Sequence, residues 1–127
     1  MEEEFIEECW FIYGVRIKNY FYGFYKYHSA GSSGHVEFDW KQAMNPMLIG
    51  WIHTHPNGFG PRPSSMDNST MAGWVRGKAR PLICGILCDD FEGWYDYYRA
   101  SNGEIVNRKV VAEHTSKFVW GRYNEIC

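Results

Sequence analysis

Two consecutive stretches near the N-terminus are dominated by aromatic and β-branched side chains. They cover residues 9–17 and 19–27, and only Lys18 separates them. Aromatic residues make up 18% of the whole chain, which is unusually high for a globular protein. Because such side chains favour the pleated backbone of a sheet, we expect two strands here.

The rest of the chain predicts further strands and two helices. Short strands are expected at residues 35–39, 47–53, 82–88, 93–99 and 105–111. A capped helix is expected over residues 64–76, where apolar side chains recur at helical spacing, and residues 112–123 are expected to close the chain with another helix. With no linker, repeat or low-complexity tract, residues 1–127 should form one α+β domain with a central sheet.

Charge and hydropathy exclude several classes of partner. Thirteen basic and fifteen acidic residues give a formal net charge of −2, so the basic surplus that binds nucleic-acid phosphates is missing. The start, Met1 to Glu4, is acidic where a secretory signal would be basic, and the longest apolar run, residues 82–88, is too short to span a membrane. We therefore expect a cytoplasmic protein without a nucleic-acid or membrane partner.

The cysteines do not form a recognisable metal or disulfide motif. There are four of them, at positions 9, 84, 88 and 127, and no pair has Cys-x-x-Cys spacing. A chain of this length does not need disulfides to hold a core, so we expect all four to be reduced. On a strand Cys84 and Cys88 share one face, which favours core packing over metal binding or redox chemistry.

The segment from Gly50 to Asp67 contains the strongest candidate site. His53 and His55 are two residues apart, so on a strand both imidazoles point to the same face. A Pro/Gly loop then turns the chain, and Asp67 follows in the first turn of the expected helix. Two imidazoles and a carboxylate leave a fourth position open, as in a catalytic zinc site.

Simpler interpretations exist for each part of this segment. A lone His-x-His is more often a surface or core feature, and Ser64-x-x-Asp67 also resembles a helix capping pair. Neither interpretation explains why a tight Pro/Gly loop joins the paired histidines to the helix. The combination therefore favours a metal site.

The same residues resemble a known family. His53-Thr-His55-Pro56 followed by Ser64-Ser-Met-Asp67 is similar to the JAMM motif of the MPN/JAB metalloproteases, and the resemblance covers most of residues 7–111. Two departures are a loop of eight residues between His55 and Ser64, one more than is common, and a shortened N-terminus. The resemblance implies a cytidine-deaminase-like MPN fold, with a central mixed β-sheet flanked by helices.

The resemblance also implies an activity. Members of the family are zinc-dependent peptidases or isopeptidases that cut after the C-terminal Gly of ubiquitin or a ubiquitin-like protein, here in a bacterial conjugation pathway. By position, His53, His55 and Asp67 would bind Zn²⁺, and Ser64 would help to hold the oxyanion. Deconjugation and processing of a precursor tail are equally compatible with the motif.

A general base is needed for this chemistry, and the family has a Glu at the head of an early strand. Glu7 matches its position, because Gly14 lies seven residues later and His53 forty-six residues later. Glu8 and Glu37 are the alternatives. A base of this kind accepts a proton from the attacking water and passes one to the leaving amine.

Two further alternatives belong to other functional classes. The first is a catalytically inactive MPN scaffold subunit, which the intact His, Ser and Asp residues disfavour. The second is a RadC-like JAB protein with a DNA-related role, which the absence of a basic surplus disfavours.

The second aromatic stretch indicates a possible contact surface. In residues 20–27 neither face of the strand is polar, so one face should pack on the core while the other shows aromatic rings outward. We expect Tyr22 and Phe24 to contact the globular body of a ubiquitin-like substrate. The competing interpretation is that these aromatic rings simply fill a small core.

Overall fold

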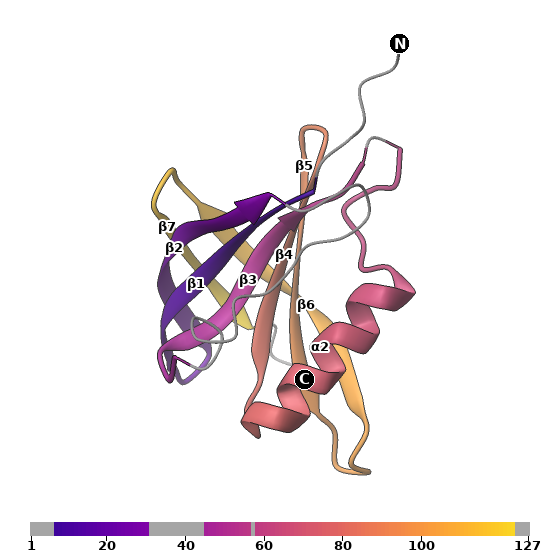
Figure 1. Cartoon of the computed structure of the whole chain (residues 1–127). Coiled ribbons are helices and arrows are strands. Elements are labelled where there is room, and N and C mark those ends of the chain that lie inside the picture. Colours follow the sequence, from indigo (N-terminus) through magenta and orange to yellow (C-terminus); the bar gives the residue numbers. More distant parts are fainter. Residues whose placement is uncertain (1–6, 31–44, 57, 124–127) are drawn as a thin grey trace.

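The computed structural model describes residues 7–30, 45–56 and 58–123, and within them seven strands form a closed barrel (Figure 1). In chain order the elements are β1 (Glu8–Ile17), β2 (Tyr20–Ala30), β3 (Leu48–Thr54), α2 (Ser65–Lys78), β4 (Leu82–Cys88), β5 (Phe91–Arg99), β6 (Ile105–His114) and β7 (Phe118–Tyr123). Around the barrel the strand order is β1-β2-β7-β6-β5-β4-β3. Strands β3 and β4 run parallel, and the other neighbours are antiparallel.

The expected α+β fold, a cytidine-deaminase-like MPN sheet flanked by helices, is wrong. The strands close on themselves, and α2 is the one helix in the described part of the chain. The decisive error lies at residues 112–123, which were expected to be helical. Here β6 continues to His114, and β7 pairs with both β2 and β6. This pairing leaves no free sheet edge, which is the energetic advantage of a barrel.

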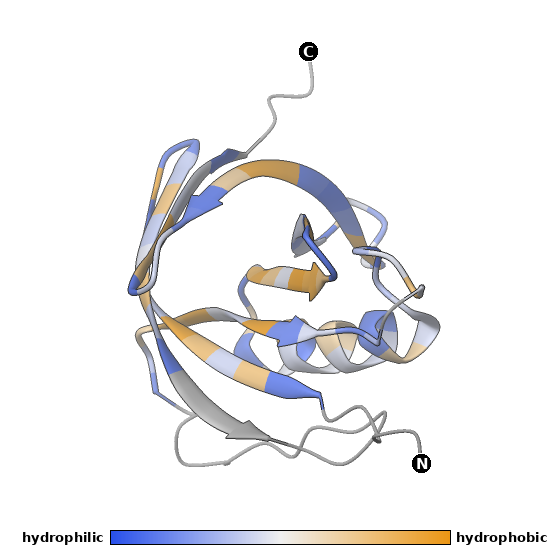
Figure 2. Ribbon diagram, turned by 90° about the horizontal axis from the view of Figure 1, so that it is seen from above, coloured by the Kyte–Doolittle hydropathy of each residue, from blue (hydrophilic) through white to orange (hydrophobic). Residues whose placement is uncertain are grey.

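Apolar side chains on the two faces of the strands form two separate clusters. One fills the barrel interior with buried side chains from all seven strands, among them Ile12, Phe21 and Trp94. The other lies on the outer face beneath α2 and includes Phe11, Trp51 and Met71. Helix α2 contacts β4, β5 and β6 and lies outside the ring of strands (Figure 2). Alternation along each strand therefore separates an interior core from an outer, helix-covered core.

The cysteines within the described residues are free and buried, as expected. Burial raises the pKa of the Cys9 thiol to about 12, so this group stays protonated at neutral pH. Cys127 and the expected strand at residues 35–39 lie outside the described residues. In the described part of the chain, no helix is long and apolar enough to cross a membrane.

Candidate metal centre

The two histidines come from the end of β3. Along this strand every residue from Leu48 to His53 is buried, which fixes its register between β1 and β4. His53 lies opposite Cys9 of β1, and His55 follows the strand, held by a hydrogen bond from its backbone N to Leu87 O at 2.8 Å. Both residues are 7% exposed. As predicted, their imidazoles share one face, and it is the outer face that carries α2.

Asp67 reaches this face from the first turn of α2. Ser64 is the N-cap, and its Oγ accepts a hydrogen bond from Asp67 N at 3.1 Å. In return, Ser64 N donates to Asp67 Oδ2 at 2.8 Å, which completes a capping box. The capping interpretation is therefore correct as a description of the helix start. It does not exclude a second role for the same carboxylate.

The three side chains converge on one point. His53 Nε2 lies 3.1 Å from Asp67 Oδ1, His55 Nε2 lies 2.9 Å from Asp67 Oδ2, and the two Nε2 atoms are 3.1 Å apart. Ligands about 2.0–2.1 Å from a tetrahedral ion lie roughly 3.3 Å from one another, so these separations are close to those around a metal. The group His53, His55 and Asp67 can hold a metal ion.

The loop before α2 orients one of these ligands. His55 Nδ1 lies 3.1 Å from Gly60 O. A carbonyl oxygen only accepts, so Nδ1 carries a hydrogen, and Nε2 would present a lone pair to a bound metal once it gives up the proton that it donates to Asp67 Oδ2. Gly60 has φ +77°, a left-handed conformation that glycine adopts without steric cost, and this turn aims its carbonyl at the ring. Tyr95 then fixes the loop by donating to Pro61 O at 3.2 Å.

Charge interactions in the site keep the carboxylate ionised. Burial alone would raise the pKa of Asp67, but hydrogen bonds from His53 and His55 outweigh it and hold this pKa well below its usual range. The hydrogen bond to Asp67 raises the pKa of His55, against the opposing effect of burial. An ionised carboxylate between two imidazoles is the charge distribution that attracts a divalent cation.

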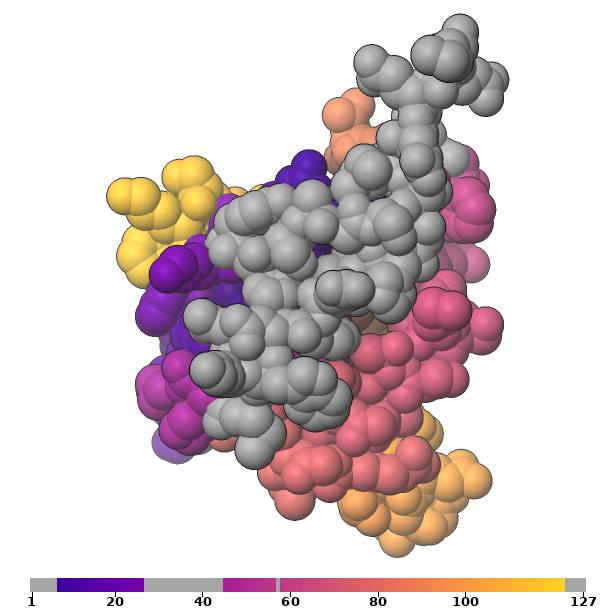
Figure 3. All heavy atoms as spheres, in the orientation of Figure 1, coloured from indigo at the N-terminus to yellow at the C-terminus, as the bar shows by residue number. Residues whose placement is uncertain are grey.

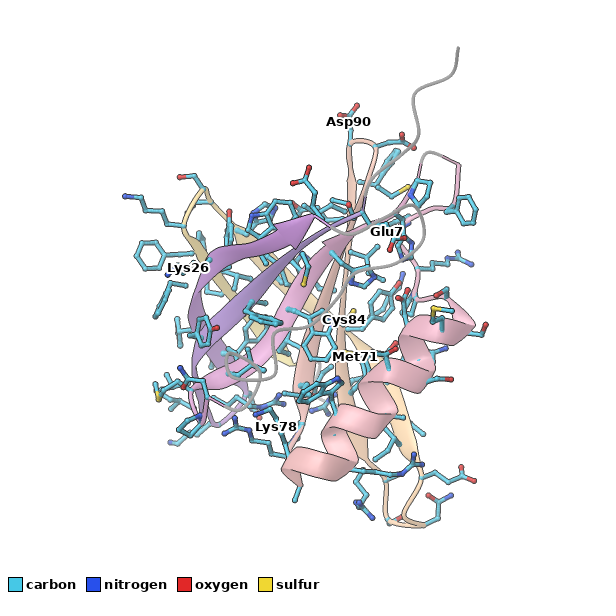
Figure 4. The ribbon with its side chains drawn as sticks, in the orientation of Figure 1. Glu7, Lys26, Met71, Lys78, Cys84 and Asp90 are labelled. Atoms are coloured by element: carbon cyan, nitrogen blue, oxygen red, sulfur yellow. The ribbon has the colours of Figure 1, made fainter. Side chains whose placement is uncertain are left out.

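Glu7 directly precedes β1, near the N-terminal end of the described chain (Figure 4). On β1, Cys9 and Phe11 belong to the outer cluster, whereas Ile12 belongs to the interior. Continuing this alternation places Glu7 on the outer face with His53 and places Glu8 on the opposite face. The negative charge of Glu7 also contributes to the raised pKa of His55, so the two groups interact. Glu37, the remaining alternative, lies outside the described residues.

Tyr22 and Phe24 are not brought to the metal centre. Tyr22 pairs with Val15, which lies eight residues along β1 from Glu7, about 26 Å at 3.3 Å per residue. Both side chains point outward, with 49% and 51% of their surface exposed. The outward direction of these rings was predicted correctly, and the sequence placed them on a contact surface for the body of a substrate, separate from the metal centre.

Sequence reasoning missed the residues that support the ligands. Nothing in the sequence marks Gly60 as a hydrogen-bond acceptor for His55, because any residue has a carbonyl. Gly93 of β5 was also missed: a Cβ there would lie 1.9 Å from Pro61 O, so its missing side chain lets the loop pack on the barrel. The Pro/Gly composition of residues 56–63 was the only available signal for this arrangement.

Comparison with known protein families and with curated proteins found no match for this chain. The resemblance to JAMM metalloproteases is therefore a hypothesis that depends on the motif.

Proposed function

We propose that the chain is a zinc-dependent peptidase or isopeptidase. The observation that carries the proposal is the convergence of two imidazole nitrogens and one carboxylate within about hydrogen-bond distance of each other, at the N-terminus of α2. Nitrogen ligands combined with a single carboxylate suit Zn²⁺ better than Mg²⁺ or Ca²⁺, which prefer oxygen ligands. Three protein ligands also leave a coordination position for a reactant.

The surrounding residues supply the other parts of a hydrolytic site. Zn²⁺ bound here would polarise a substrate carbonyl and lower the pKa of a water molecule. Glu7, on the same face as the ligands, would accept the proton of the attacking water and deliver it to the leaving amine. The Ser64 hydroxyl accepts from Asp67 N and keeps its own hydrogen, which can be donated to a developing oxyanion. The N-terminus of α2 favours negative charge at the same place.

The proposed substrate is the extended, Gly-ending tail of a ubiquitin-like protein. This part of the proposal depends on the motif. It is supported by two strongly exposed apolar side chains close to the ligands in sequence: Phe59 on the loop is 74% exposed, and Met66, next to Asp67, is 66% exposed. These side chains offer apolar contacts to a chain that lies along the site.

The test is a comparison of Glu7→Gln with Glu8→Gln. We expect Glu7→Gln to retain zinc and to lose hydrolysis by about 10²–10⁴-fold, because proton transfer is removed while the ligands are intact. Glu8→Gln is the matched control and should keep most activity, since its side chain is on the other face. The measurements are zinc content and cleavage of a ubiquitin-like protein fused through its C-terminal Gly to a reporter. Equal losses in both variants would contradict the assignment, and a zinc-loaded wild type that cleaves no such fusion would contradict the substrate.

A further inference from the structure

A large apolar surface lies on the side of the barrel away from the metal centre. Among the described residues, eleven large hydrophobic side chains are strongly exposed, and seven of them belong to the outer faces of β1, β2, β6 and β7. These seven, which we call the apolar sheet face, are Val15, Ile17, Tyr20, Tyr22, Phe24, Val111 and Phe118. In Figures 1 and 3 strands β2 and β7 lie on the opposite side of the molecule from α2.

Strand register makes this surface continuous. The pairings align three rows across neighbouring strands: Ile17, Tyr20, Arg122 and Val111; Val15, Tyr22, Trp120 and Glu113; and Tyr13, Phe24 and Phe118. At the edge of the face, the exposed ring of Phe24 packs on the buried ring of Tyr13, with centroids 5.7 Å apart. Four members of the face are aromatic, and each is about half exposed: Tyr20, Tyr22, Phe24 and Phe118. Because an aromatic side chain has roughly 200 Å² of surface to bury, these rings alone offer on the order of 400 Å² of exposed apolar surface. With the aliphatic side chains added, the face exceeds the few hundred Å² that monomeric proteins usually expose.

The charged residues around the face are mostly basic. Lys18 lies at the β1–β2 turn, Lys26 continues β2 beyond Phe24, and Lys117 directly precedes Phe118. Arg122 lies within the face opposite Val111, and the acidic Glu113 lies opposite Trp120. Figure 4 shows Lys26 projecting outward from β2. This excess of basic over acidic groups, four against one, is local, because the whole chain has a net charge of −2.

We infer that the apolar sheet face binds a partner protein whose contact surface is apolar at its centre and acidic at its rim. Such a surface matches both the rings and the basic border. A second copy of this chain would bring like charges together. Single-stranded nucleic acid fits less well, because three of the seven side chains are aliphatic and the Tyr20 and Tyr22 rings already stack on each other. Since the metal centre lies elsewhere, the partner would leave it accessible, and the inference does not depend on the proposed activity.

The test uses a displayed library of three-helix-bundle domains randomised on one face, selected on the intact protein. We expect the enriched domains to combine apolar and acidic residues. They should bind Tyr22→Thr/Phe24→Thr at least tenfold more weakly than wild type, and Lys26→Glu should weaken binding most at low salt. Phe91→Thr is the matched control, because Phe91 is 67% exposed but lies at the start of β5, off this face. Unchanged thermal unfolding of each variant shows that folding is intact.

Three outcomes would overturn the inference. The first is a set of enriched domains without acidic residues, or with equal affinity for the double variant. The second is a wild-type dimer, measured by light scattering, that Tyr22→Thr/Phe24→Thr abolishes, which would identify a second copy as the occupant. The third is micromolar binding of a 20-nucleotide single-stranded DNA that the same double variant loses.

Discussion

Asp67 serves the helix and the metal centre with one carboxylate. Its Oδ2 accepts from Ser64 N at the helix start and faces His55, while its Oδ1 faces His53. The capping interpretation and the ligand interpretation of Ser64-x-x-Asp67 are therefore compatible. The hydrogen bond that completes the capping box also holds the carboxylate in the orientation that the imidazoles require.

Substitutions should separate the two roles. Asp67→Asn keeps an oxygen that can accept from Ser64 N but removes the negative charge, so it should lose metal while the protein stays folded. Ser64→Ala removes the cap hydroxyl and should lower the free energy of unfolding by about 1 kcal/mol while metal is retained. Metal analysis and chemical unfolding of both variants check this. Stoichiometric metal in Asp67→Asn would show that the carboxylate is not a ligand.

At the scale of elements, most strands could be predicted from the sequence. Residues 9–17, 47–53 and 82–88 are rich in β-branched or aromatic side chains, and the structure confirms a strand at each. The helix at α2 was also confirmed, because its cap and its apolar spacing are local signals. Local signals were weaker at residues 112–123, where pairing with β2, nearly a hundred residues earlier, decides the structure. The sequence contains no direct sign of that long-range pairing.

Gly121 in β7 distinguishes a strand from the helix first expected there. In the barrel, a Cβ at Gly121 would lie 2.3 Å from Val111 O and 2.7 Å from the Phe21 ring. Gly121→Ala should therefore destabilise the protein by about 1–3 kcal/mol through overpacking. In a helix the same change would stabilise by roughly 0.5–1 kcal/mol. Chemical unfolding gives the sign, and a stabilised variant would contradict the closed barrel.

The sequence predicted the candidate site better than it predicted the fold. His53 and His55 are close in sequence, and strand periodicity alone places them on one face. Asp67 could be included because a short Pro/Gly loop limits how far it can lie from them. The closed barrel could not be predicted in this way, because closure depends on the pairing of β2 with β7.

At the scale of the whole molecule, a buried ion cluster lies within the barrel. Asp96 of β5 has no exposed surface, and it pairs with Arg16 of β1 at 2.8 Å and Arg108 of β6 at 3.0 Å. Burial raises the pKa of Asp96 against the opposing effect of the two guanidinium groups. The cluster thus links β1, β5 and β6, and its Arg16 lies 80 residues before Asp96 in the sequence.

Removing this carboxylate should weaken the whole barrel. Asp96→Ala leaves two arginines without their shared partner, which typically costs about 3–5 kcal/mol. The lower end is expected, because the Arg16 and Arg108 side chains are 22% and 29% exposed and can reach water. Asp90→Ala, at the exposed β4–β5 turn, is the control and should change the unfolding free energy by less than about 0.5 kcal/mol. Equal stability of the two variants would mean that the cluster does not hold the strands together.

The most direct test of the central claim is the zinc content of the purified protein. After purification without chelators, elemental analysis should find one zinc per wild-type chain and none in His53→Ala, because removing one of three ligands abolishes tight binding. Phe91→Thr, which changes a strongly exposed side chain at the start of β5 and none of the three ligands, should match the wild type. A wild-type protein without stoichiometric metal, or His53→Ala with unchanged zinc, would contradict a metal centre formed by His53, His55 and Asp67.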